Sequence, residues 1–119
     1  LIAQNAAVLG ASNVIAVPGT APEALAELPP PDRVFVGGSG GALRAILAAA
    51  LDKRPDLRAV VSAVTLETLQ EAVSAFEELH FQDVDLVQVA VTRTRKAGSY
   101  HMMEAQNPVW LISGTGGAE

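Results

Sequence analysis

Four glycines around Ser39 constrain this chain more than any other feature. They follow the short apolar run at residues 34–36, and a helical pattern of apolar residues begins directly after them. Glycine lets the backbone turn sharply and approach a ligand without a Cβ in the way. Strand, glycine-rich loop and helix, in this order, present small molecules at the carboxyl edge of a parallel sheet. The sequence therefore predicts a ligand-binding loop at residues 37–41, after a strand covered on both faces.

The rest of the chain alternates between helical and strand-like patterns. Helices are expected at residues 1–9, 20–28, 43–51 and 66–79, and strands at 13–17, 34–36, 57–64, 84–92 and 109–112. Thr20 and Thr65 are the expected N-caps of the second and fourth helices. The adjacent apolar residues Leu86 and Val87 suggest a β-bulge, and residues 93–107 form a polar stretch. This order predicts an α/β domain with a mostly parallel sheet that ends in an antiparallel pair.

Composition bounds the classes of function. The chain has 119 residues, half of them apolar, and a formal charge of −5, so we expect a single globular domain over residues 1–119 without general affinity for nucleic acid. No apolar run approaches the ~20 residues that a membrane span needs. The lack of cysteine excludes thiolate metal sites and fits a reducing compartment, so we expect a cytoplasmic protein and no metal site.

The glycine-rich loop is compatible with more than one chemistry. A dinucleotide fingerprint fails because position 43 is not glycine, and no Gly-Lys-Ser/Thr follows to make a P-loop. The pattern Gly37-x-Ser39-x-Gly41 satisfies the nucleophile elbow of α/β-hydrolases, and Asp85 and His101 follow in the required order. His101 nevertheless precedes the last expected strand, where such a triad needs it to follow. A small serine hydrolase that uses Ser39 is therefore an alternative interpretation of this loop. The simplest interpretation is that the glycines only form a tight turn and bind no ligand.

Several segments, taken in order, resemble one known family. They are DRVFVGGSGG at 32–41, AVTLE at 63–67, HM at 101–102 and NPVWLISG at 107–114. They resemble the decarboxylating, C15-methylating domain or small subunit of the precorrin-6Y C5,15-methyltransferases of cobalamin biosynthesis, over essentially the whole chain. The resemblance implies the class I S-adenosylmethionine-dependent methyltransferase (Rossmann-like) fold. It also implies methylation at C15 of a precorrin, with loss of carbon dioxide from the C12 acetate.

The chain also departs from the family pattern. The first strand with its glycine-rich loop, and the second strand with its acidic ribose-binding residue, are not in the sequence. We therefore expect a C-terminal part of the domain, with the first strands missing and an incomplete cofactor site. A truncated binding or assembly module without catalysis is a further alternative. Thr20 stands where the family tends to have an acidic residue, Ser62 where asparagine is common, and His80 where glycine often caps a helix.

The resemblance implies roles for individual residues. Decarboxylation of a pyrrole acetate needs an acid that protonates the ring, and Glu67 and His101 are the candidate catalytic acids. S-adenosylmethionine would be bound by Gly19, Thr20, Ala21, Gly37 and Gly38, and the tetrapyrrole substrate by Ser39, Gly40, Thr65, Arg93 and Arg95. Glu67 is equally compatible with a solvated first-turn carboxylate, and His101 with a surface residue.

The polar stretch near the C-terminus contains three of the eight basic residues within four positions: Arg93, Arg95 and Lys96. These fit a cationic rim for the many carboxylates of a precorrin, or a charged edge strand that deters aggregation. Tyr100, Met102 and Met103 are candidates for packing against a macrocycle or a subunit. The resemblance implies homotetramers assembled through the terminal strand region, with a second, N-terminal methyltransferase domain on some parent chains.

Overall fold

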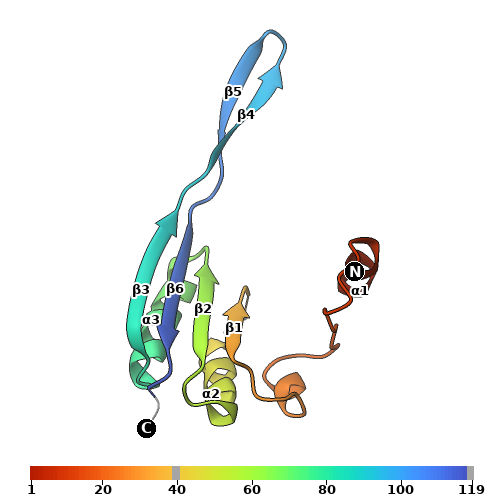
Figure 1. Ribbon diagram of the computed structural model, residues 1–119. Coiled ribbons are helices and arrows are strands. Elements are labelled where there is room, and N and C mark those ends of the chain that lie inside the picture. Colours follow the sequence, from red (N-terminus) through yellow and green to blue (C-terminus); the bar gives the residue numbers. More distant parts are fainter. Residues whose placement is uncertain (39–40, 118–119) are drawn as a thin grey trace.

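The computed structural model describes residues 1–38 and 41–117 (Figure 1). Within these residues four strands form the main sheet, in the spatial order β1 (Arg33–Val36), β2 (Arg58–Ala63), β6 (Val109–Thr115) and β3 (Gln82–Val89). β1 and β2 are parallel, whereas β6 is antiparallel to both β2 and β3. Three of these strands therefore run in one direction, and the antiparallel β6 lies between two of them. From β1 onward, the predicted α/β alternation and the antiparallel final pair of β3 and β6 are confirmed.

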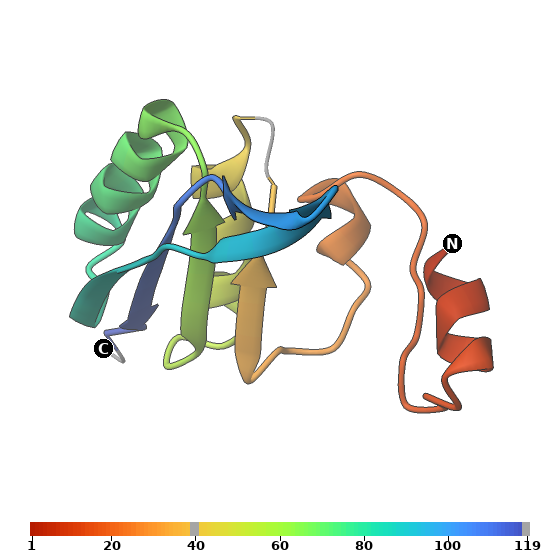
Figure 2. The ribbon, with the colours of Figure 1, turned by 90° about the horizontal axis from the view of Figure 1, so that it is seen from above.

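Two helices, α2 (Leu43–Lys53) and α3 (Leu66–Glu78), cover the same face of the sheet (Figure 2). The predicted apolar stripe of α2 is confirmed, because Leu43, Ile46, Leu47 and Ala50 are buried. α3 buries Ala72, Ala75 and Phe76, whereas its first residue, Leu66, is 73% exposed.

β1 lies at the edge of this sheet, and one of its two faces is exposed. The prediction of a strand covered on both faces is therefore wrong. Val36 is buried under the helices, whereas Phe35 points to the opposite face and is 67% exposed. Among the described residues, β1 has one strand neighbour, β2. An apolar run of three residues indicates a strand but carries no information about what packs on its second face.

Two predictions for the N-terminal part are wrong. α1 (Ile2–Val8) forms as expected, but residues 13–17 form no strand, and Val14, Ile15 and Val17 are exposed. A strand exists only where another strand completes its hydrogen bonds, and these residues have no such neighbour in the described chain. The helix expected at 20–28 is reduced to the 3-10 turn η1 (Glu23–Leu25), which Thr20 does not cap with its side chain. Prolines at 22 and 29–31 leave too few backbone donors for a longer helix.

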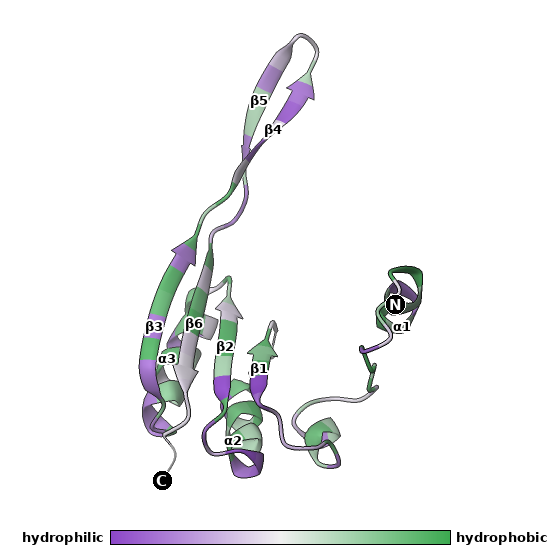
Figure 3. Ribbon diagram, in the orientation of Figure 1, coloured by the Kyte–Doolittle hydropathy of each residue, from purple (hydrophilic) through white to green (hydrophobic). Residues whose placement is uncertain are grey.

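The polar stretch at 93–107 forms a β-hairpin that the sequence pattern did not predict. β4 (Thr92–Ala97) and β5 (Tyr100–Ala105) pair in an antiparallel manner and extend the β3–β6 pair well beyond the sheet (Figure 1). Nearly every residue of this arm is exposed, and hydrophilic and hydrophobic residues are mixed along its two strands (Figure 3). The irregularity in β3 falls between Gln82 and Asp85, not at Leu86 and Val87 as predicted. None of the described helices is long and apolar enough to cross a membrane.

Candidate functional site

The carboxyl ends of β1, β2 and β3 meet at one edge of the sheet, and most of the predicted site residues follow them. Gly37 and Gly38 come directly after β1, Thr65 and Glu67 start α3 after β2, and the hairpin arm extends from β3 (Figure 1). The hydroxyl of Ser62, on β2, donates to the carbonyl oxygen of Gly37 at 3.5 Å and connects the first two strand ends. This is the edge where open α/β sheets bind their ligands.

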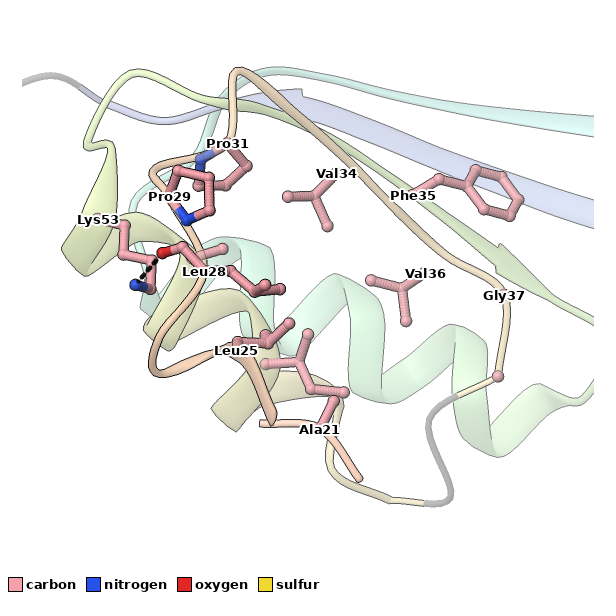
Figure 4. Close-up of a pocket in the computed structure, with 13 residues that line it drawn as sticks. Ala21, Leu25, Leu28, Pro29, Pro31, Val34, Phe35, Val36, Gly37 and Lys53 are labelled. Carbon is pink, nitrogen blue, oxygen red and sulfur yellow. Dashed lines mark hydrogen bonds between the residues drawn. The ribbon is translucent and has the colours of Figure 1, made fainter. Parts of the chain in front are cut away.

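A pocket of about 300 Å³ reaches this edge (Figure 4). Ala21, Gly37 and Gly38 line it, so three of the five predicted cofactor residues share one cavity. Gly19 and Thr20 precede Ala21 along the chain and do not line it. The body of the pocket is formed by side chains from the η1 segment, β1 and α2, among them Leu25, Leu28, Pro29, Pro31, Val34, Val36, Ile46 and Ala50.

The two ends of this pocket differ in chemistry. The body is apolar, and the ammonium group of Lys53 there already donates to the backbone oxygens of Ala26 (3.0 Å) and Leu28 (2.6 Å). At the other end, no heavy atom of the described residues, chain neighbours aside, lies within 4 Å of the position that a Cβ on Gly38 would occupy. A Cβ on Gly37, in contrast, would lie 3.4 Å from the Phe35 ring, so the open position is at Gly38. The glycine end therefore offers exposed backbone groups to a polar ligand, whereas the body offers apolar packing.

The start of α3 is confirmed as predicted. The hydroxyl oxygen of Thr65 accepts a hydrogen bond from the Thr68 backbone N–H at 3.1 Å, which makes Thr65 the N-cap. Glu67 is exposed in the first turn, where a carboxylate also interacts favourably with the helix dipole. Both interpretations of Glu67, as an acid and as a solvated first-turn residue, stay compatible with this position.

The hairpin divides the basic cluster between two faces. Arg93 and Arg95 share one face, where the Arg95 guanidinium pairs with Glu104 at 2.9 Å. Lys96 lies on the opposite face, directly across from His101. A ligand on one face of the arm therefore meets either the two arginines or the Lys96–His101 pair. The sequence analysis did not separate these basic residues into two faces, because it did not predict the hairpin.

The hydrolase alternative is not favoured. Asp85 lies within β3, opposite Ser113, whereas His101 is on the hairpin arm, opposite Lys96. The two are therefore far apart, and no His–Asp pair forms among the described residues. Two predicted residues lie outside the described residues: Ser39, the nucleophile of this alternative, and Gly40, a predicted substrate-binding residue.

Sequence reasoning missed Glu71, which reaches the N-terminus of α2 from α3. Its Oε1 atom accepts a hydrogen bond from the backbone N–H of Leu43 at 3.1 Å. No local signal could have revealed this contact, because it joins residues far apart in the chain.

Comparisons with known proteins agree with this geometry. A family model described as the precorrin methyltransferase domain matches residues 1–115. A probable cobalt-precorrin-6B C(15)-methyltransferase (decarboxylating) from Pyrobaculum calidifontis is 45% identical over 114 residues, which cover 95% of this chain and 58% of the relative. The protein of the same name from Methanothermobacter thermautotrophicus is 43% identical over 101 residues, covering 84% of this chain and 52% of the relative. The chain spans about half the length of these curated relatives.

Solved structures show the same likeness. The precorrin-6y C5,15-methyltransferase from Geobacter metallireducens superposes with a TM-score of 0.87 at 40% identity, covering 96% of this chain and 60% of that one. A precorrin 8w decarboxylase from Methanobacterium thermoautotrophicum gives 0.85 at 39% identity, over 94% and 61%. An S-adenosylmethionine-dependent O-methyltransferase from Thermotoga maritima, 12% identical with a TM-score of 0.55 over 76% and 35%, shares the fold alone. The Rossmann-like methyltransferase fold expected from the sequence is confirmed.

Proposed function

Because this chain belongs to the precorrin methyltransferase domain family, we propose that it methylates C15 of a precorrin and removes the carboxyl group of the C12 acetate, in cobalamin biosynthesis. The proposal is carried by the open backbone position at Gly38, which lines the pocket at the carboxyl edge of the sheet, where open α/β sheets bind their ligands. The names of the relatives state this C15 methylation and decarboxylation for those proteins. In this proposal residues 1–119 act as one methyltransferase domain.

S-adenosylmethionine is the proposed cofactor, and it would supply the methyl group as a sulfonium. The glycine end of the pocket fits a ligand of this kind, because exposed backbone groups lie next to the apolar side chains of Ala21 and Val36. Gly37, Gly38 and Ala21 would contact the cofactor. Gly19, with φ of +135°, allows the turn that leads through Thr20 into the pocket. The chain's contribution to methyl transfer is then to align the reactants and exclude water.

The proposed substrate is a tetrapyrrole that carries many carboxylates. Arg93 and Arg95 would bind these carboxylates from one face of the arm, and Thr65 would contact the substrate at the start of α3, together with Ser39 and Gly40. Loss of carbon dioxide leaves an electron pair that must accept a proton, and Glu67 or His101 would supply it.

We also propose that the protein acts as a homotetramer in the cytoplasm, where its lack of cysteine is compatible with a reducing environment. The exposed side chains of Tyr100, Met102 and Met103 on the arm support a contact between subunits. An additional N-terminal methyltransferase domain on the parent chain is part of the same proposal.

The direct test is to incubate the whole protein that carries this chain with S-adenosylmethionine and a C12-acetate precorrin, and to follow methyl incorporation and carbon dioxide release. Both products are expected. The Ser39→Ala variant should keep substantial activity, because a methyltransferase needs no serine nucleophile, whereas a serine hydrolase would lose its activity. A folded protein that binds S-adenosylmethionine without turnover would instead support the binding-module alternative.

A further inference from the structure

The N-terminus of α2 is capped from another helix. Its N-cap residue is Ala42, which has no side-chain oxygen to accept from the first free backbone N–H groups. The carboxylate of Glu71, from the middle of α3, takes this role by accepting the Leu43 N–H at 3.1 Å. Glu71 is half-buried, and the Leu43 side chain is fully buried. The hydrogen bond from the Leu43 N–H and the packing of the Leu43 side chain therefore both fix the backbone at this residue.

The helix that Glu71 caps forms one wall of the pocket. Ile46 and Ala50, on α2, line the pocket together with Gly37 and Gly38. The position of this wall depends on how α2 is held, and Glu71 holds its first residue, Leu43.

A second polar contact between the same helices provides a comparison. Arg44, on α2, pairs with Glu78, on α3, and both side chains are more than half exposed. An exposed pair of this kind adds little to stability, and it does not touch the α2 N-terminus. Removing Glu78 therefore disturbs the contact between the helices without releasing the cap.

We propose that Glu71 is a positioning residue of the cofactor site: from α3 it caps α2 and thereby sets the pocket wall that α2 forms beside Gly37 and Gly38. The inference rests on the proposed function and adds a residue that acts through the backbone without touching the ligand.

The test compares Glu71→Ala, Glu71→Gln and the matched control Glu78→Ala in the whole protein. The dissociation constant for S-adenosylmethionine is measured by calorimetry, and exchange of the Leu43 amide hydrogen by NMR or mass spectrometry. Glu71→Ala should weaken binding about tenfold and speed Leu43 exchange about tenfold, typical of a lost cap. Glu71→Gln keeps an acceptor oxygen and should stay within about threefold of wild type, as should Glu78→Ala. With saturating cofactor, kcat of Glu71→Ala should recover, so that the loss appears in KM.

Three results would overturn the proposal. Glu71→Ala with unchanged cofactor affinity would show that the cap does not set the site. An equal loss in Glu78→Ala would assign the effect to general packing between the helices. A loss in Glu71→Gln as large as in Glu71→Ala would assign it to charge. Failure of the wild-type protein to bind S-adenosylmethionine would instead reject the proposed function, and unchanged Leu43 exchange would then reject the cap separately.

Discussion

Two glycines near the sheet illustrate opposite uses of a missing Cβ. Within the part of the chain that the structure describes, a Cβ on Gly38 would meet no heavy atom within 4 Å apart from its chain neighbours, whereas one on Gly116 would overlap the carbonyl oxygen of Pro55. Gly116 also donates its N–H to the Leu57 oxygen at 2.8 Å, which fixes the approach of the two segments. Packing therefore requires glycine at position 116, whereas the contacts described around position 38 leave room for a side chain.

Replacing Gly38 by alanine should consequently weaken cofactor binding without lowering the stability of the fold. The added methyl group enters the space proposed for the cofactor, so the dissociation constant for S-adenosylmethionine should rise about tenfold or more. The melting temperature should stay close to that of wild type. Gly116→Ala should lower the melting temperature clearly, because the backbone has to move. Calorimetry and thermal unfolding measure the two effects, and unchanged affinity in Gly38→Ala would argue against a cofactor at this end of the pocket.

The two candidate acids allow a second residue-scale prediction, because methyl transfer does not need the proton that decarboxylation needs. Glu67→Gln or His101→Gln, whichever removes the acid, should slow carbon dioxide release by about 10²- to 10⁴-fold. Methyl incorporation should continue in that variant, and a methylated product that keeps its acetate should accumulate. Mass spectrometry of the products distinguishes the two steps. Full decarboxylation by both variants would reject both residues as the acid.

At the scale of elements, the correct predictions concern structure that depends on residues close together in the sequence. The spacing of apolar residues after the glycines predicted the helix, and these residues are buried in α2. The Thr65 cap was predictable because its hydrogen bond joins residues only three positions apart. The missing strand at 13–17 and the unexpected hairpin were predicted wrongly, since strands depend on partners that are remote in sequence. For the candidate site, the family motifs predicted Gly37 and Gly38, which line the pocket. They could not reveal the two faces of the arm or the Glu71 contact, which depend on tertiary pairing.

The end of α3 gives an element-scale prediction. The Phe81 N–H donates to the Phe76 oxygen, and the His80 N–H to the Glu77 oxygen, which together form a Schellman motif. The rings of Phe76 and Phe81 stack with centroids 4.5 Å apart, as the hydrophobic contact of that motif. His80 occupies the left-handed position of the motif, with φ of +60°, where glycine is usual. This agrees with the family pattern, in which glycine often stands at this position.

His80→Gly should therefore stabilise the protein by about 0.5–1 kcal/mol, since the strain of a left-handed residue with a Cβ exceeds the entropy cost of glycine. The free energy of unfolding in urea measures the change. Glu77→Gly, one turn earlier on the same exposed side of the helix end, is the control and should cost about 1 kcal/mol. A loss of stability in His80→Gly would mean that the imidazole makes a stabilising contact outweighing the strain.

The whole molecule is more extended than a domain of its length should be. Its radius of gyration is 17.4 Å and its longest dimension is 59 Å. A compact domain of this length has a radius of gyration of about 13–14 Å. The hairpin arm accounts for much of this length (Figure 1). An isolated two-stranded hairpin is at best marginally stable in water, and this one exposes Tyr100, Met102 and Met103. A well-formed arm is therefore expected to gain stability from contacts with other subunits.

The proposed tetramer can be tested on the arm itself. Met102 and Met103 point to opposite faces, so a contact on either face loses apolar area when both become lysine. Met102→Lys/Met103→Lys should shift the mass measured by sedimentation equilibrium from a tetramer to smaller species, because buried charges without partners are costly. The control Met102→Leu/Met103→Leu keeps the apolar area and should remain a tetramer. If the lysine variant keeps the mass of the wild type, subunits do not meet through this arm, and its methionines are free to face the tetrapyrrole instead.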